Sequence, residues 1–487
     1  MYMICAISAR IPLLCKSPFA IDPRPLTEMG SAHAGLLATS RALRSLNLSG
    51  LVEANLDLKN RQRGFSEGQM IESLVLLQTL GGDCVEDIAL LEEDLCLARG
   101  LGYTPPKASA ARTFLNRFHD EEIANLRPPR EVQKSFIMPP SAPQQGLDLV
   151  LAGMVGKIAA LLKKQGQQQK IATVDQDATI IESHKKSALS HYDNGRGYQP
   201  MVALWSEADL VLASEFRDGN VPAKQSPLSC AKLAFQALPP GIKERYFRGD
   251  SACHENELIS WLNDPARALE PGARIGFCVS AVLDPSLVTA LHAVKEKAWT
   301  TYGTEADGTQ RQWAEVNFVP GASYEHKESV PLRYVGLRLL KAQGLLFADG
   351  TDRKHYAVLS NLNWEGGRLL SWHREKAGTI EHAHDEIKNA LGGGHMPSQK
   401  LAVNAAWFTI ALLAYNAASA IKSLCLDAEE RTARFKRYRL LVIEIAGRMS
   451  RSECKLRLRL HASNKAIRRI QKIWEVFDLP TQATAFS

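Results

Sequence analysis

The sequence predicts an α/β protein: a mixed sheet with flanking helices, interrupted by a β-rich insertion and preceded by an all-helical N-terminal domain. Three observations predict this fold. Apolar residues recur at helical three-to-four spacing between residues 31 and 125. Strand-like and helical segments follow one another between 171 and 280, as in mixed α/β sheets. More strand-like segments lie between about 281 and 360, ahead of the last core helices.

The composition is that of a soluble globular protein. The chain has 487 residues, of which 45% are hydrophobic and 23% charged, so it can hold two or three domains. Its net charge of +7 is compatible with a polyanionic partner but does not by itself indicate a function. The nine cysteines form no CxxC pair, which favours a reducing compartment and argues against a zinc site or a disulfide framework.

Two apolar segments bear on membrane association. Residues 1–28 begin without a basic n-region, so we expect an N-terminal extension and not a secretory signal. Residues 401–421 carry no charge and are long enough to cross a bilayer. They contain Asn404, Thr409 and Asn416, which favours a buried core helix, with a membrane span as the minor alternative.

The N-terminal region is predicted to be a series of short helices with glycine and proline breakers between them. The predicted helices cover 36–46, 67–80, 85–91 and 109–118. This pattern suits a DNA-binding or dimerisation module and, slightly better, a plain helical bundle. The proline-rich segment 128–145 predicts a linker, and a helix is expected over about 147–164.

The next segment predicts the sheet. Its expected order is three strands, helix, strand, helix, strand, which matches the ribonuclease-H-like order as far as it goes. The predicted strands are 171–181, 200–205, 210–216, 245–249 and 275–280, and the helices are 230–237 and 254–262. In the β-rich insertion the predicted strands are 311–319, 334–340 and 356–359, and the chain after Cys425 is basic.

One further helix is predicted over Gly378 to Gly394. Thr379 is its expected N-cap, and the glycine run from Gly392 allows the left-handed turn that closes a helix. The expected buried stripe consists of Ile380, Ala383, Ile387 and Leu391.

The polar side of this helix carries the first candidate functional residues. Glu381, His384, Asp385 and Lys388 share a flank at offsets of three, four and seven residues. A carboxylate in the first turn and a lysine two turns later suit metal-assisted phosphate chemistry. Taken alone, an ordinary charged helix face is the better interpretation.

Two upstream aspartates change that balance. Asp177 lies in the first predicted strand and Asp250 directly follows the fourth, so both side chains can reach one pocket if these strands are neighbours. Phosphodiester cleavage requires an activated oxygen nucleophile, which a pair of magnesium ions held by carboxylates provides. Asp175 faces the same side of the strand as Asp177, so alternation cannot choose between the two.

Several sequence blocks together resemble one family. In chain order they are GGDCVEDIALLEED from Gly81, VDQDATIIESHKK from Val174, GYQPMVALW from Gly197, FRDGN from Phe216, FRGDSACHENEL from Phe247, GTIEHAHDEIKN from Gly378 and NAAWFTIALLAYN from Asn404. With these blocks in this order, the chain resembles the group-1 DDE transposases of bacterial insertion sequences, from about Met29 into the C-terminal tail.

The resemblance implies a ribonuclease-H-like core that binds two Mg²⁺ ions, for which Mn²⁺ substitutes, through Asp177, Asp250 and Glu381. Asp177 is preferred to Asp175 because it precedes Ala178-Thr179, a context closer to that of the family. Water attack at the element's end would free a 3′-hydroxyl, which then attacks target DNA.

Residues that contact DNA are also implied. Related enzymes carry a tyrosine–arginine–glutamate–lysine signature, of which Glu381 and Lys388 match the second half while the first half does not match. The residues expected to contact DNA are Lys388, Arg374, Lys376 and Lys185.

The expected partners are double-stranded DNA, as terminal inverted repeats and target, and further copies of the chain in a homodimer or higher synaptic assembly. No membrane is expected, and the expected location is the bacterial cytoplasm at the nucleoid. Two rival functions remain. One is a nuclease of the same fold without strand transfer, and the other is a catalytically idle, transposon-derived DNA-binding protein, against which the complete carboxylate set argues.

These expectations divide the chain into seven parts. They are an N-terminal extension (1–28), a helical DNA-end-binding or dimerisation domain (29–127), a linker and helix (128–170), the first part of the catalytic core (171–280), a β-rich insertion (281–360), the second part of the core (361–425) and a basic C-terminal region (426–487).

Overall fold

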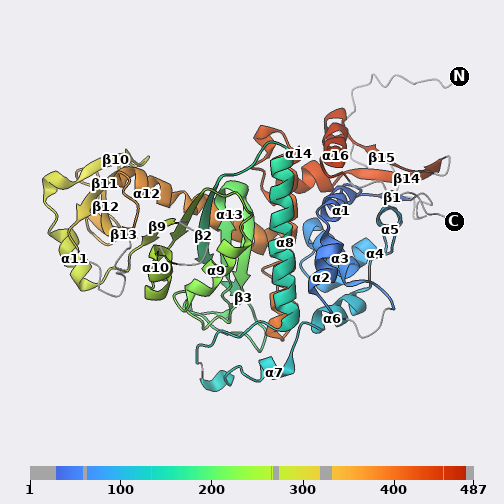
Figure 1. Ribbon diagram of the computed structural model, residues 1–487, viewed down its shortest axis with the longest axis horizontal. Helices are drawn as coiled ribbons and strands as arrows, with labels where there is room; N and C mark the ends of the chain where they lie inside the picture. Colours follow the sequence, from blue (N-terminus) through green and yellow to red (C-terminus); the bar gives the residue numbers. More distant parts are fainter. Residues whose placement is uncertain are drawn as a thin grey trace, which may run out of the picture.

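The structure is a computed structural model, and it describes residues 29–58, 63–132, 134–264, 266, 274–318, 332–452 and 455–478. The predicted N-terminal extension and the last residue of the predicted strand 311–319 lie outside the described residues. Along the longest axis of the molecule, the first helices and the last strands occupy one end and strands β10–β13 the other (Figure 1).

Short helices form the N-terminal part, as predicted. Serine and aspartate caps set their starts: Ser66 and Gln69 form a reciprocal capping box at α3, and the Asp94 carboxylate accepts from the Leu97 N–H at α5. The predictions missed α2, α5 and α7. The helices are α1 (Leu36–Ser45), α2 (Leu48–Asn55), α3 (Glu67–Leu80), a 3-10 turn (Val85–Ile88) with α4 (Ala89–Glu92), α5 (Leu95–Leu101), α6 (Ala108–Asn116) and α7 (Glu121–Ala124).

Two long helices stand at the centre of the molecule, α8 (Ala142–Lys164) and α14 (Leu401–Cys425) (Figure 1). The expected start of the first at residue 147 was wrong. Ser141 caps the helix by accepting from the Gln144 N–H, and Pro143 is tolerated in the first turn because that turn needs no backbone donor.

Both long helices are long and apolar enough to cross a membrane, but α14 is a core helix, as predicted. Its most apolar window is 94% buried inside the protein, against 44% for that of α8. The Asn416 side chain accepts from the Val211 N–H and donates to the Val211 carbonyl, both at 2.8 Å, and so fixes α14 on strand β7. Its buried polar groups therefore have partners within the fold.

The predicted mixed α/β sheet is confirmed. It has nine strands in the order β10-β11-β12-β13-β9-β8-β2-β6-β7. Strand β2 is parallel to β8 and antiparallel to β6, β8 is parallel to β9, and β6 is antiparallel to β7. The elements in chain order are β2 (Ile171–Ala178), β6 (Met201–Trp205), β7 (Leu210–Glu215), α9 (Pro227–Ala237), β8 (Glu244–Gly249), α10 (Asn256–Asn263) and β9 (Ile275–Ser280).

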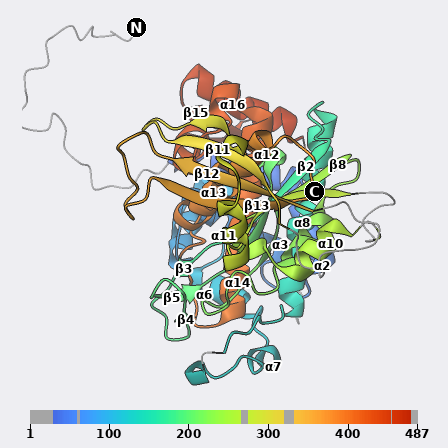
Figure 2. The ribbon, with the colours of Figure 1, turned by 90° about the vertical axis from the view of Figure 1, so that its left-hand side faces the viewer.

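The β-rich segment extends this same sheet. After α11 (Pro285–His292), an antiparallel meander runs from β10 to β13, and β13 pairs with β9 so that Val358 is opposite Ser280. The three predicted strands are present, and β10 was missed. The strands are β10 (Thr300–Thr304), β11 (Gln310–Val316), β12 (Arg333–Leu340) and β13 (Arg353–Ser360). Figure 2 views the molecule from this end.

Two small sheets complete the described strands. One follows β2 and consists of β3 (Ile181–Glu182), β5 (Arg196–Tyr198) and β4 (Leu189–Ser190), none of which was predicted separately. The other joins the two ends of the described chain, with β1 (Gly30–Ser31) pairing with β14 (Ala446–Ser452) and β14 with β15 (Lys455–His461).

The last helices close the core. The chain passes from β13 through α12 (Gly366–Arg374) into α13 (Lys376–Asp385), which continues as a π-helical turn (Glu386–Ala390). Helix α13 packs on β2 and β6. Beyond α14, the described chain contains α15 (Phe435–Tyr438) and α16 (Asn464–Val476), and α16 packs on α1 and α14.

Candidate active site

Asp177 and Asp250 stand side by side at the edge of the sheet. The parallel strands β2 and β8 place Gln176 opposite Gly249. Asp177 is the residue after Gln176 in β2, and Asp250 directly follows Gly249, the last residue of β8. The expectation that these two strands are neighbours is confirmed. Two carboxylates are therefore brought together by backbone pairing alone, before any side-chain interaction is considered.

The ammonium group of Lys376 lies against this pair. Its Nζ is 2.8 Å from Oδ2 of Asp177, and the side chain is buried at the start of α13. Burial opposes the charge of Lys376, but attraction to Asp177 and Asp250 outweighs it, so its pKa is raised above the ordinary value. One cation thus partly neutralises two carboxylates.

Asp250 shows that the neutralisation is incomplete. Burial raises its pKa and the charge of Asp177 raises it further, against the opposing effects of Lys376 and of the backbone N–H groups of Ala252 and Cys253. The Ala252 N–H donates to Oδ1 at 3.0 Å and orients the carboxyl group. The cluster retains a negative charge that another cation would relieve.

Glu381 lies at the rim of the same region. Its side chain is exposed on α13 and lines an open depression of about 650 Å³ that is also lined by Lys376 and by Ser251, the residue after Asp250. The structure therefore brings Asp177, Asp250 and Lys376 together and places Glu381 in the adjoining depression. The carboxylate oxygens of Asp177, Asp250 and Glu381 are ligands of the kind that Mg²⁺ prefers.

Asp175 and Asp177 both face α13, as alternation predicts, but their surroundings differ. Asp175 is fully buried, and its two oxygens accept from Nε and Nη2 of Arg248 at 2.6 and 2.9 Å. The Asp177 side chain is 19% exposed. Asp175 is thus committed to a buried ion pair, whereas the carboxylate of Asp177 remains partly accessible to solvent.

The predicted helix cap at Thr379 was wrong. Helix α13 begins at Lys376, only Glu375 separates it from α12, and the Thr379 hydroxyl donates to the Asp175 carboxylate instead. The predicted end is confirmed, because Gly392 adopts a φ of +66°. The four predicted stripe residues are buried, namely Ile380, Ala383, Ile387 and Leu391.

His384 belongs to that buried stripe and not to the polar flank on which it was expected. His384 lies four residues after Ile380, and in a helix this offset places the two side chains on the same face. The offset could therefore have predicted that His384 is buried. Burial lowers its pKa to about 4, against the attraction of the Asp177 charge. Its Nε2 is buried and has no hydrogen-bond partner among the described residues. A neutral imidazole therefore lies beside the carboxylates with one nitrogen unused.

The four residues expected to contact DNA are not gathered on one surface. Lys376 is buried against Asp177, so the structure places it within the carboxylate cluster. Arg374 is exposed, with Nη1 at 3.7 Å from Oε1 of Glu305. Lys388 is half-buried in the π-helical turn and donates to the Ile180 carbonyl at 3.3 Å, and Lys185 is half-buried between β3 and β4.

A family model matches most of the chain. The family described as Transposase DDE domain group 1 matches residues 28–477. No curated protein matches the chain. Among solved structures, the chain is similar to a piggyBac transposase synaptic complex with hairpin DNA, with 11% identity and a TM-score of 0.42, over 84% of this chain and 80% of that one.

Proposed function

The chain belongs to the family Transposase DDE domain group 1, and on that premise we propose that it is a transposase acting on an insertion sequence. It cleaves DNA strands at the ends of the element and transfers them to target DNA, in a reaction that depends on divalent metal ions. The observation that carries this proposal is the position of Asp177 and Asp250 at adjacent strand ends, with α13 bringing Lys376 against Asp177 and Glu381 into the adjoining depression.

A ribonuclease-H-like core is part of the proposal. Its support is the order β7-β6-β2-β8-β9, in which the first three strands along the chain are antiparallel neighbours and the next two run parallel to the first. In this arrangement the ends of β2 and β8 share one edge of the sheet. We assign the catalytic and metal-binding roles to Asp177, Asp250 and Glu381.

These residues fit a pair of magnesium ions. Burial and then the neighbouring charge of Asp177 raise the pKa of Asp250, and the charge that remains is of the sign that a cation neutralises. When bound, such ions activate the attacking oxygen and stabilise charge on the leaving oxygen. Manganese is expected to substitute for magnesium, because it also accepts carboxylate oxygens.

The chain's own residues hold this site in shape. The ion pair of Arg248 with Asp175 and the Thr379 hydroxyl bond join β8, β2 and α13, so the helix that carries Glu381 is fixed relative to Asp177 and Asp250. The Lys376 ammonium orients Asp177. In the proposed reaction, water attacks the phosphorus at the element's end, and the P–O bond to the 3′ oxygen breaks to leave a 3′-hydroxyl. That hydroxyl then attacks a phosphorus of the target strand, and the target's own P–O3′ bond breaks, so one phosphodiester replaces another.

The proposal includes the partners and the location. The substrate is double-stranded DNA, as terminal inverted repeats and target, and the helical N-terminal region is assigned to DNA ends or to dimerisation. Because two ends must be cut within one complex, the active form is a homodimer or a higher assembly. The expected location is the bacterial cytoplasm.

The test is a cleavage and joining assay. Purified protein is incubated with Mg²⁺ and a labelled fragment carrying the element's own terminal repeat. Asp250→Ala and Glu381→Ala are compared with wild type and with Asp385→Ala, a matched control that removes a half-exposed carboxylate from the same helix. Nicked and joined products are expected from wild type and the control, and from neither site variant.

Each rival function has its own outcome in this assay. Cleavage without any joined product would identify a nuclease. Binding of the fragment without cleavage, unchanged by either site variant, would identify an idle DNA-binding protein and overturn the catalytic proposal.

A further inference from the structure

Strands β14 and β15 form an antiparallel two-stranded ribbon at the end of the molecule opposite the β10–β13 meander (Figure 1). Pairing runs from Ala446 opposite His461 to Ser452 opposite Lys455. The sheet order is β1-β14-β15, so β15 is an edge strand. The carboxylates assigned to catalysis lie on or directly after strands β2 and β8 of the nine-stranded sheet and on α13, so the ribbon is a separate feature.

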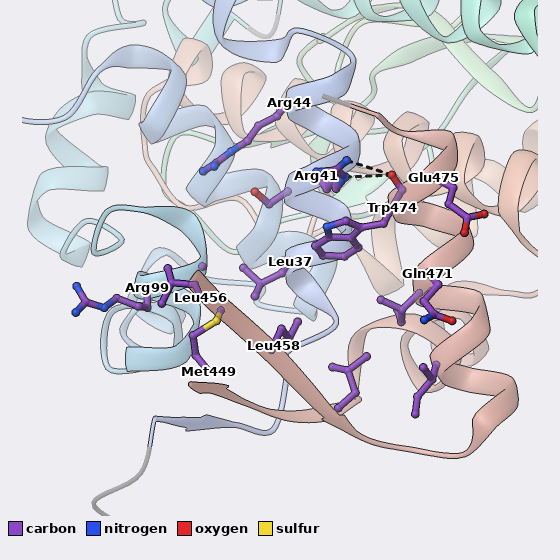
Figure 3. A pocket seen from close by; sticks show the side chains of 15 residues that line it. Leu37, Arg41, Arg44, Arg99, Met449, Leu456, Leu458, Gln471, Trp474 and Glu475 are labelled. Atoms are coloured by element: carbon purple, nitrogen blue, oxygen red, sulfur yellow. Dashed lines mark hydrogen bonds between the residues drawn. The ribbon is translucent and has the colours of Figure 1, made fainter. Parts of the chain in front are cut away.

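One face of the ribbon is committed to the body of the protein. Leu456, Leu458 and Leu460 alternate along β15 and line an open groove of about 650 Å³, together with residues of α1 and α16. Figure 3 shows Leu456 and Leu458 in this groove, with Trp474 of α16 on its other side. Leu458 and Leu460 pack against the hydrophobic core and hold the ribbon to the molecule, whereas Leu456 is 50% exposed.

The opposite face of the ribbon is basic. Lys455, Arg457, Arg459 and His461 alternate with the leucines and are all exposed, and Arg448 of β14 lies directly opposite Arg459. The residues of the two strands include no Asp or Glu. These exposed basic side chains give this face a positive charge of the kind that attracts a polyanion.

Resting on the proposed function, we propose that this face, called here the basic ribbon, binds the phosphate backbone of double-stranded DNA outside the segment being cleaved. Arginine is suited to phosphate, because its planar guanidinium can donate two parallel hydrogen bonds. A two-stranded β-ribbon also fits the major groove of B-DNA. Contacts of the arginine side chains to phosphate position the duplex and carry no sequence information.

The basic ribbon could also serve to protect an edge strand or to attract lipid. Charged residues on an exposed edge strand prevent pairing with other chains, and that protection alone could account for the basic residues. A basic surface also attracts acidic lipids. DNA binding is favoured because the basic residues lie on one face of a ribbon in a member of a DNA transposase family.

The test measures how DNA affinity depends on salt. The variant Arg457→Gln/Arg459→Gln is compared with wild type in binding a labelled duplex of arbitrary sequence, in EDTA, over a series of salt concentrations. Loss of two phosphate contacts is expected to weaken binding and to lower the slope of log affinity against log salt by about 1.8. The control Lys163→Gln/Lys164→Gln removes the same charge from the exposed end of α8 and is expected to leave the slope unchanged.

Thermal unfolding of the variant accompanies the binding assay. Because Arg457 and Arg459 are exposed, the melting temperature of the variant is expected to stay close to that of wild type. An unchanged salt slope would overturn the proposal. Aggregation of the variant, with a soluble fraction that binds DNA like wild type, would also overturn it and indicate protection of the edge strand. So would a variant that binds DNA like wild type but has lost binding to phosphatidylserine vesicles in a parallel assay.

The two proposals fail separately. If wild type cleaves its terminal repeat but the ribbon variant binds DNA as tightly as wild type, only the proposal for the basic ribbon is overturned. Ribbon-dependent binding by a wild-type protein that never cleaves its terminal repeat would overturn only the catalytic proposal.

Discussion

At the scale of single residues, two aspartates two positions apart have separate tasks. Asp175 pairs with the buried Arg248, and the partly exposed Asp177 pairs with Lys376, which lines the depression. The alternation of β2 places both on the same side and gives no means of choosing between them. Arg248 comes from β8, distant in sequence, and its pairing with Asp175 is what distinguishes the two.

This difference predicts that two similar substitutions have different effects on stability and on strand cleavage. Asp175→Asn leaves the charge of Arg248 buried without its main partner, so the free energy of unfolding should fall by about 3 kcal/mol. Asp177→Asn removes a partly exposed carboxylate and should cost much less stability while abolishing strand cleavage. Urea denaturation of both variants measures this, and equal loss of stability would show that Asp175 has no special structural role.

Part of the site could be predicted from the sequence. The proximity of Asp177 to Asp250 follows from strand order, because parallel neighbours end at the same edge of a sheet. The position of Lys376 could not, because its partner Asp177 is contributed by another element. The burial of His384 was predictable from its offset of four residues from Ile380. Its spacing from Glu381 and Lys388 favoured the polar flank instead.

At the scale of elements, helix α13 shows where local signals fail. Gly378 and Thr379 look like the start of a helix, yet α13 begins at Lys376 and contains both. Packing of its buried stripe outweighs the cost of an interior glycine, which is about 1 kcal/mol. By contrast, Gly392 ends the helical segment where predicted, because only a left-handed residue fits there.

The two glycines should therefore respond in opposite directions to alanine. At Gly392, with φ +66°, a Cβ would lie 2.7 Å from the Gly82 carbonyl oxygen, so Gly392→Ala should lower the free energy of unfolding by about 2 kcal/mol. At Gly378 a Cβ meets nothing within 4 Å, and Gly378→Ala should raise it by about 0.5–1 kcal/mol. Shifts of the same sign in the urea midpoint would contradict this assignment of the helix.

In strand β15, by contrast, the local sequence pattern agrees with the structure. Leu456, Leu458 and Leu460 alternate with basic residues, a period of two that predicts a strand. The charge of this segment alone predicts only a basic region. Its partner β14 lacks so regular a pattern, and the pairing of β14 with β1 depends on residues at the other end of the chain.

At the scale of the whole molecule, the beginning and the end of the described chain are packed together. Strand β1 pairs with β14, and Arg41 of α1 donates to the Trp474 carbonyl of α16 at 3.3 and 3.2 Å. At Gly35 the backbone of residues 442–443 approaches so closely that a Cβ would lie 1.7 Å from the Val442 carbonyl oxygen. The helical N-terminal region and the C-terminal region are thus one packing unit.

Gly35→Ala is expected to separate these two regions. Because backbone atoms must move to admit the Cβ, the free energy of unfolding should fall by about 3 kcal/mol. Limited proteolysis should then cut the C-terminal region sooner. Gly30→Ala is the control, since its Cβ would meet Gly447 at an ordinary 3.9 Å. Identical proteolysis of both variants would show that Gly35 does not govern this docking.

The join between β9 and β13 has a consequence for how such a protein changes over evolution. The chain leaves the central strands at Ser280 and returns at Val358, directly opposite in the sheet. The segment between these positions therefore starts and finishes at the same point of the framework. Because the entropy cost of closing a loop rises slowly with its length, this segment can lengthen, shorten or be exchanged with little effect on β2 and β8. New binding specificities can be acquired there while the carboxylates keep their places.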